Sequence, residues 1–275
     1  MRIDSHQHFW RFNQTDYGWM QPGWPIRRDF LPADLAPELR ACQLDGCVVV
    51  QARQSLVETR WLLELAATAP SIRGVVGWVD LCSPDVGKEL EEFAAHPKFV
   101  GVRHVVQDEP DDGFMLRPDF QRGIAALRQC DFTYDLLIFP RQLSAAVALA
   151  QKFSEQPFVL DHLAKPPIKA GTLSPWREQL QELAKCPNVC CKVSGLVTEA
   201  SWSDWRAEDF LPFLDVAFDA FGPDRLMFGS DWPVCRLAAS YQSVFELVRN
   251  FVRRFGADDQ AKIFGENAVK FYGLK

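Results

Sequence analysis

Short apolar runs recur along the whole chain, and stretches with the spacing of amphipathic helices lie between them. The first run covers residues 1–9, and a second, at 46–51, reads Gly-Cys-Val-Val-Val-Gln. Between these two runs, Leu35, Leu39 and Leu44 have helical spacing, which predicts a helix over about 32–44. The pattern therefore begins as strand, helix, buried strand.

The same alternation continues to the end of the chain. Ser55 and Glu58 form a capping box that begins a helix reaching Leu65, and Ser83-Pro84 is expected to begin another. Further helices are expected at 118–130, 140–153, from 174, at 207–221 and in the C-terminal remainder. The expected strands cover residues 1–9, 46–51, 74–80, 99–104, 133–138, 157–162, 188–194 and 225–231.

Eight strands, each followed by a helix, predict a (β/α)8 barrel built as a single domain over residues 1–275. An open doubly wound sheet is the alternative. No Gly-x-Gly-x-x-Gly turn follows any expected strand, which weakens a dinucleotide-binding form of that alternative.

Charge and composition exclude several classes of function. The chain has 30 basic and 36 acidic residues and no basic stripe, which argues against nucleic-acid binding. No apolar run is long enough to span a bilayer and no signal segment is recognisable, so a cytoplasmic protein without membrane contact is expected. The 8 cysteines include no Cys-x-x-Cys pair, which indicates reduced, mostly buried thiols rather than a structural zinc site.

Polar side chains gather at the carboxyl ends of the expected strands, where the active sites of (β/α)8 barrels lie. Asp4, His6 and His8 share one face of the first strand because successive side chains alternate. Two imidazoles at this spacing can hold a metal ion or polarise a carbonyl group. The later strands end in Gln51, Asp80, Arg103-His104, Asp161-His162, Lys192, Ser194 and Asp231.

Ordinary structural explanations exist for each of these residues. His162 could be a core histidine bonded to a backbone carbonyl, and Asp231 could cap the turn that follows it. Arg103 could simply form an ion pair with a nearby aspartate. The loop tryptophans, Trp10, Trp19, Trp24 and Trp202, could pack on each other instead of on a ligand. All histidines except His96 lie at strand ends, and this clustering favours a functional site.

Four motifs together resemble the amidohydrolase superfamily, in its amidohydrolase-related branch. They are Asp4-Ser5-His6-Gln7-His8, Leu160-Asp161-His162-Leu163, Met227-Phe228-Gly229-Ser230-Asp231-Trp232-Pro233 and Ile263-Phe264-Gly265-Glu266-Asn267-Ala268. The resemblance covers the whole chain and is nearest to the sugar lactonases, which include L-fuconolactone and L-rhamnonolactone hydrolases. It implies a carboxylic-ester hydrolase that opens a small sugar lactone to the aldonic acid.

The resemblance also implies roles for individual residues. Asp231 would be the general base on water, while His6, His8 and His162 would polarise the lactone carbonyl, directly or through a metal. The sugar would be held by Arg103, His104, Gln51, Lys192, Trp10 and Trp202.

The metal ligands are where the chain departs from the family pattern. Arg103-His104 ends the strand on which binuclear members carry a carboxylated lysine, and the strand at 133–138 lacks the histidine of mononuclear members. The resemblance therefore implies that no cofactor is required, although one zinc ion could bind His6, His8 and Asp231. The alternatives are a metal-dependent decarboxylase or C–C hydrolase, and a binding protein without catalysis. The identity of the sugar and the oligomeric state do not follow from the sequence.

Overall fold

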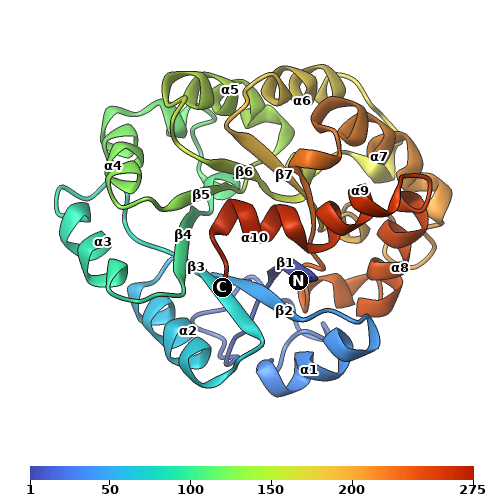
Figure 1. The fold of residues 1–275 in the computed structure, drawn as a ribbon, viewed down its shortest axis with the longest axis horizontal. Coiled ribbons are helices and arrows are strands. Elements are labelled where there is room, and N and C mark those ends of the chain that lie inside the picture. Colours follow the sequence, from blue (N-terminus) through green and yellow to red (C-terminus); the bar gives the residue numbers. More distant parts are fainter.

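Eight parallel strands, paired in chain order, form the centre of the molecule (Figure 1). The computed structural model describes residues 1–275. Backbone N–H groups of His8 and Asp231 donate to the carbonyls of Trp232 (2.7 Å) and His6 (2.8 Å), which closes the sheet between its first and last strands. The predicted (β/α)8 barrel is therefore confirmed. The strands are β1 (Ile3–Gln7), β2 (Gly46–Val50), β3 (Ile72–Gly77), β4 (Phe99–His104), β5 (Thr133–Leu136), β6 (Phe158–Leu160), β7 (Val189–Val193) and β8 (Leu226–Phe228).

Helices surround this barrel and follow the strands in sequence (Figure 1). They are α1 (Pro32–Ala41), α2 (Leu56–Thr68), α3 (Val86–Ala94), α4 (Pro118–Gln129), α5 (Leu143–Lys152), α6 (Trp176–Ala184), α7 (Ala207–Phe221), α8 (Tyr241–Val252), α9 (Ala257–Ala261) and α10 (Asn267–Tyr272). None of them combines the length and the apolar character that crossing a membrane requires.

Two kinds of boundary differ from the sequence prediction. Ser83 does not begin a helix: its hydroxyl accepts a hydrogen bond from the backbone of Asp85 in a turn, and α3 begins at Val86. The strands expected at 157–162 and 225–231 end earlier, at Leu160 and Phe228. Their polar ends leave the sheet because the chain turns there, and this turn directs side chains into the top of the barrel.

The amino end of the barrel is closed by α10, which lies across it near the chain termini (Figure 1). Ala268, Tyr272 and Leu274 pack on side chains inside the barrel, and this inner group also contains Ile3, Val48, Val50, Val76, Val159 and Met227. The lower half of the barrel interior is thus mostly apolar and sealed. Polar side chains occupy the upper half, at the carboxyl ends of the strands.

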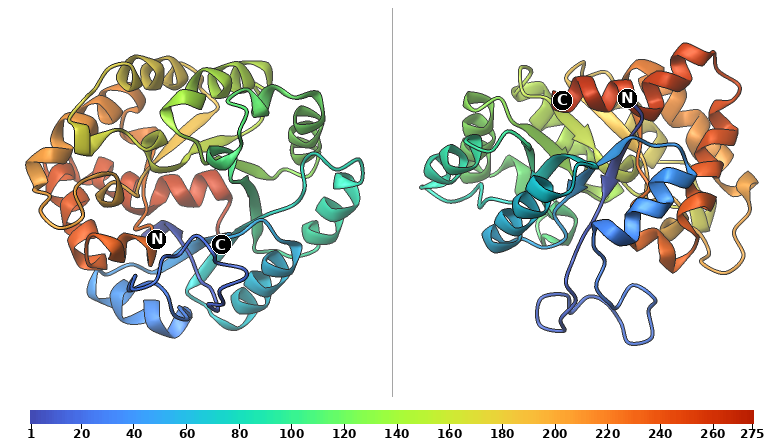
Figure 2. Two further views of the ribbon diagram at one scale, coloured as in Figure 1. Left: turned by 180° about the vertical axis from the view of Figure 1, so that it is seen from behind. Right: turned by 60° about the horizontal axis from the view of Figure 1, so that its bottom comes forward.

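The segment between β1 and α1 projects from the carboxyl end of the barrel (Figure 2). Trp10 anchors it: its backbone pairs with Phe30, and its indole N–H donates to the carbonyl of Arg28 (2.9 Å). Trp19 packs against Trp10, with ring centroids 6.1 Å apart. This aromatic segment forms one wall of the opening above the strands.

Candidate active site

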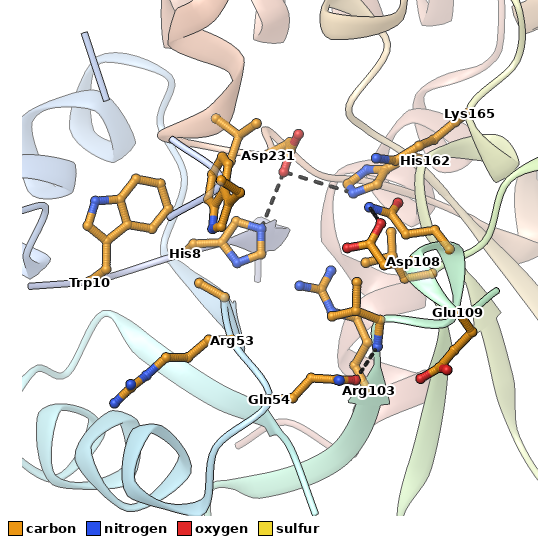
Figure 3. A pocket seen from close by; sticks show the side chains of 16 residues that line it. His8, Trp10, Arg53, Gln54, Arg103, Asp108, Glu109, His162, Lys165 and Asp231 are labelled. Carbon is orange, nitrogen blue, oxygen red and sulfur yellow. Dashed lines mark hydrogen bonds and ion pairs between the residues drawn. The ribbon is translucent and has the colours of Figure 1, made fainter. Parts of the chain in front are cut away.

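A cavity of about 600 Å³ opens at the carboxyl ends of the strands (Figure 3). Five residues predicted to belong to the site line it: Asp231, His8, His162, Arg103 and Trp10. His6 lies directly behind this wall and is fully buried. The structure therefore brings all four expected catalytic side chains together.

Three imidazoles surround the carboxylate of Asp231, and Figure 3 shows two of them, His8 and His162. Its Oδ1 lies 3.3 Å from Nε2 of His8 and 3.9 Å from Nε2 of both His6 and His162. The two Nε2 atoms of His6 and His8 are 3.3 Å apart. Nitrogen and oxygen atoms that are far apart in the sequence thus face one small volume.

Each histidine is oriented by a second hydrogen bond. Nδ1 of His8 lies 2.7 Å from the carbonyl of Val50, and Nδ1 of His162 lies 2.8 Å from the hydroxyl of Ser194. A carbonyl only accepts, so Nδ1 of His8 carries a proton, and in the neutral form of the ring the lone pair is therefore at Nε2.

Asp4 does not join this group, although it alternates with His6 and His8 along β1. Its carboxylate accepts hydrogen bonds from the backbone and hydroxyl of Ser230 (2.9 and 2.6 Å) and from the hydroxyl of Tyr241 (2.9 Å). Asp4 therefore links β1 to Ser230, the residue before Asp231. These hydrogen bonds hold His6 and His8, on and after β1, in position relative to Asp231.

A left-handed turn positions His162. Four consecutive non-glycine residues, His162 to Lys165, have φ between +52° and +57°. Each such residue costs on the order of 1 kcal/mol. The indole N–H of Trp176 on α6 donates to the carbonyl of Leu163 (2.7 Å) and holds the turn in place. This strained turn directs both His162 and Lys165 to the cavity.

Charges in the site are set by burial and by the histidine–aspartate contacts. Burial by itself would raise the pKa of Asp231, but the facing histidines, His162 foremost, outweigh it and hold that pKa below its ordinary value. Burial lowers the pKa of His162 to about 4 and that of His6 well below its ordinary value. Near neutral pH the site therefore contains an ionised carboxylate facing neutral His6 and His162 rings.

The structure does not bring four of the expected sugar-binding residues to the cavity wall. Gln51 is fully buried and donates to the carbonyl of Arg103 (3.2 Å), and His104 pairs with Glu109 (2.7 Å). Lys192 lies below the site among buried carboxylates. Trp202 packs on Trp24, with ring centroids 5.4 Å apart. This agrees with the alternative in which the loop tryptophans pack on each other instead of on a ligand.

Several residues of the cavity were not identified from the sequence. They come from the loops after β2, β4 and β6, and they are Arg53, Gln54, Gln107, Asp108, Glu109 and Lys165. Their position directly after strands was the available signal, but loop conformation decides which of them face inward. Asp135 was also missed: it is a charged residue inside the short strand β5, and that placement could have indicated a buried partner.

The donor set fits one metal ion. Ligand atoms of His6, His8 and Asp231 lie within 4.8 Å of one another, and the bond from His8 to Val50 is the outer contact typical of a ligating histidine. A second ion, at His6, Asp161 and His162, is disfavoured because Asp161 is already paired with two cations, Arg103 at 3.1 Å and Lys192 at 2.9 Å.

Comparison with known proteins identifies the class. The amidohydrolase family model matches residues 3–274, and the chain belongs to this family. The L-fucono-1,5-lactonase of Burkholderia multivorans is 44% identical over 286 residues, covering 100% of this chain and 96% of the relative. That of Burkholderia ambifaria is 40% identical over 281 residues, covering 99% and 96%. The crystal structure of an amidohydrolase from Burkholderia multivorans with bound zinc superposes with a TM-score of 0.96 at 44% identity, covering 100% of both chains.

Proposed function

We propose that this enzyme hydrolyses a sugar lactone of the L-fuconolactone type to the aldonic acid. The observation that carries the proposal is the ionised Asp231 carboxylate, facing three imidazoles at a cavity of about 600 Å³. Two relatives that match the chain over almost its whole length are L-fucono-1,5-lactonases, which supports a lactone as the substrate and a carboxylic-ester hydrolase as the class.

The reaction needs a base, a water molecule and donors for the developing oxyanion. Asp231 accepts a proton from water as the water oxygen adds to the lactone carbonyl carbon. When the tetrahedral intermediate collapses, the ring C–O bond breaks and Asp231 returns the proton to the leaving alkoxide. A lactone is an activated ester, so this single base can serve both steps.

The hydrogen bonds seen in the structure refine the roles of the histidines. When Nδ1 of a neutral His8 ring donates to Val50, its Nε2 carries no proton, so His8 does not polarise the carbonyl and instead lies beside the water that Asp231 activates. His162 and Arg103 then donate to the substrate carbonyl oxygen. A zinc ion bound by His6, His8 and Asp231 would add Lewis-acid polarisation, and the proposed mechanism does not require it.

The rim of the cavity supports a neutral, hydroxyl-rich substrate. It combines the cations Arg53 and Lys165, the anions Asp108 and Glu109, and amide side chains. Hydroxyl groups both donate and accept, so they match such a mixed rim better than an anionic substrate does. Trp10 and Trp19 supply apolar surface for the carbon face of the ring.

The test is acid release from a panel of aldonolactones, measured with chelator, with added zinc, and with the metal content determined. We expect release that persists in chelator and falls at least ~100-fold in Asp231→Asn. Asp224→Asn, on the surface, is the matched control. Release that disappears in chelator and returns with zinc would mean that the metal is essential. Release from no lactone would overturn the proposal and turn attention to decarboxylation of aromatic acids.

A further inference from the structure

A buried cluster of charged residues lies beneath the cavity and contacts His6 from below. Nζ of Lys192 lies 2.5 Å from Oδ2 of Asp135, 2.9 Å from Oδ1 of Asp161 and 3.1 Å from Nδ1 of His6. These four side chains are fully buried. The hydroxyl of Tyr272 donates to Asp135 from the opposite side (3.0 Å). Lys192 therefore sits where it cannot reach a substrate, yet it touches a residue of the site.

The hydrogen-bond directions in this cluster bear on the position of the proton in His6. An ammonium group only donates, so a hydrogen bond from Lys192 requires a lone pair at Nδ1 of His6. At the other side of the ring, Nε2 of His6 faces Nε2 of His8, which is an acceptor because His8 donates to Val50. A proton on Nε2 of His6 satisfies both contacts. The hydrogen bonds then run in one direction, from Lys192 through His6 and His8 to the carbonyl of Val50.

The opposite tautomer conflicts with Lys192. A proton on Nδ1 of His6 could be donated to Oδ1 of Asp161, 3.2 Å away, but it would face the ammonium of Lys192 at 3.1 Å, donor against donor. That tautomer would let His6 accept from Nη1 of Arg103, 3.3 Å away. With the proton on Nε2, His6 and Arg103 face each other as two donors, but Arg103 has acceptors in Asp161 (3.1 Å) and in the carbonyl of Gln51, and the contacts of His6 with Lys192 and His8 are both satisfied.

We propose that Lys192 is a positioning residue that holds the proton of His6 on Nε2, so that Nε2 of His6 donates to His8 instead of offering a metal-binding lone pair. Zinc coordination through Nε2 then requires this proton to move to Nδ1, against Lys192. The cluster thus favours the metal-free form of the site. Only the catalytic consequence, a His8 ring held in place beside Asp231, rests on the proposed function.

The direct test is the ¹⁵N NMR spectrum of histidine-labelled, chelator-treated protein. We expect the shift of a protonated nitrogen at Nε2 of His6 and of an unprotonated nitrogen at Nδ1. The reverse pattern would overturn the proposal. This measurement uses the unaltered protein, so it is decisive even if a variant fails to fold, and it does not depend on lactonase activity.

A charge-balanced variant tests the cause. Lys192→Met combined with Asp135→Asn removes one positive and one negative charge, which leaves Asp161 free to accept from Nδ1 of His6. We expect the His6 proton to move to Nδ1 and the Kd for zinc to tighten about 10–100-fold, measured by competition with a chromophoric chelator. Tyr272→Phe, which alters the same cluster without touching His6, should change neither. An unchanged proton position and zinc Kd in the double variant would also overturn the proposal.

Discussion

Gly195 shows how a single missing methyl group can determine the position of a proposed catalytic residue. Its φ is +63°, and a Cβ there would lie 2.5 Å from Nδ1 of His162. We expect Gly195→Ala to displace the His162 ring and to lower kcat/KM by up to ~100-fold. Gly171→Ala is the matched control, because Gly171 has φ +64° and open space at its Cβ position. Both variants place a β-carbon at a left-handed φ, which costs on the order of 1 kcal/mol, and only Gly195→Ala also displaces His162, so equal activity in the two would contradict the expectation.

His162 should also govern how the rate depends on pH. Its pKa is lowered to about 4, and that of Asp231 lies below its ordinary value. Protonation of His162 would form an ion pair with Asp231 and weaken the base, and it occurs as the pH falls through the pKa of His162. We therefore expect kcat/KM to stay level from about pH 7 to pH 5 and to decline near pH 4, after uncatalysed hydrolysis is subtracted. A decline centred near pH 6.5, the ordinary value for histidine, would contradict this assignment.

At the scale of elements, some side chains of the loops after the strands line the cavity, and others pack outside it. Trp19 and Trp202 are similarly exposed, at 44% and 41%, and both pack on Trp24. Only Trp19 lines the cavity. We expect Trp19→Ala to raise KM for the lactone about tenfold, equivalent to ~1.4 kcal/mol of binding, and Trp202→Ala to leave it near the original value. A larger effect from Trp202→Ala would restore its expected place in sugar binding.

At the scale of the whole molecule, α10 seals the amino end of the barrel and contacts the charged cluster from below. The hydroxyl of Tyr272 donates to both carboxylate oxygens of Asp135, at 3.1 and 3.0 Å. Removal of this hydroxyl leaves the buried carboxylate of Asp135 with one hydrogen-bond donor fewer. We therefore expect Tyr272→Phe to lower the free energy of unfolding by about 1.5–3 kcal/mol. Urea denaturation measures this loss. The lactonase rate should change little, because Tyr272 lies on the side of the cluster away from the cavity.

The barrel and four proposed catalytic residues could be predicted because they depend on local order along the chain. A strand followed by a helix, repeated eight times, leaves few topologies, and strand ends meet at one face of the barrel. His6, His8, His162 and Asp231 come together for that reason. The early ends of β6 and β8 were not predictable, because apolar composition does not show where the backbone turns left-handed.

What the sequence by itself determined is therefore the barrel, the family and the set of polar residues at the strand ends. The tertiary structure decided which of these face the cavity and which face each other. Lys192 and Gln51 lie on or directly after strands, as predicted, but their side chains are buried against partners from other strands. Loop residues such as Lys165 and Asp108 reach the cavity through backbone conformations that the sequence pattern does not reveal. How deeply a side chain lies in the barrel, and how a loop is folded, depend on several chain segments at once. Neither can therefore be predicted from a single stretch of sequence.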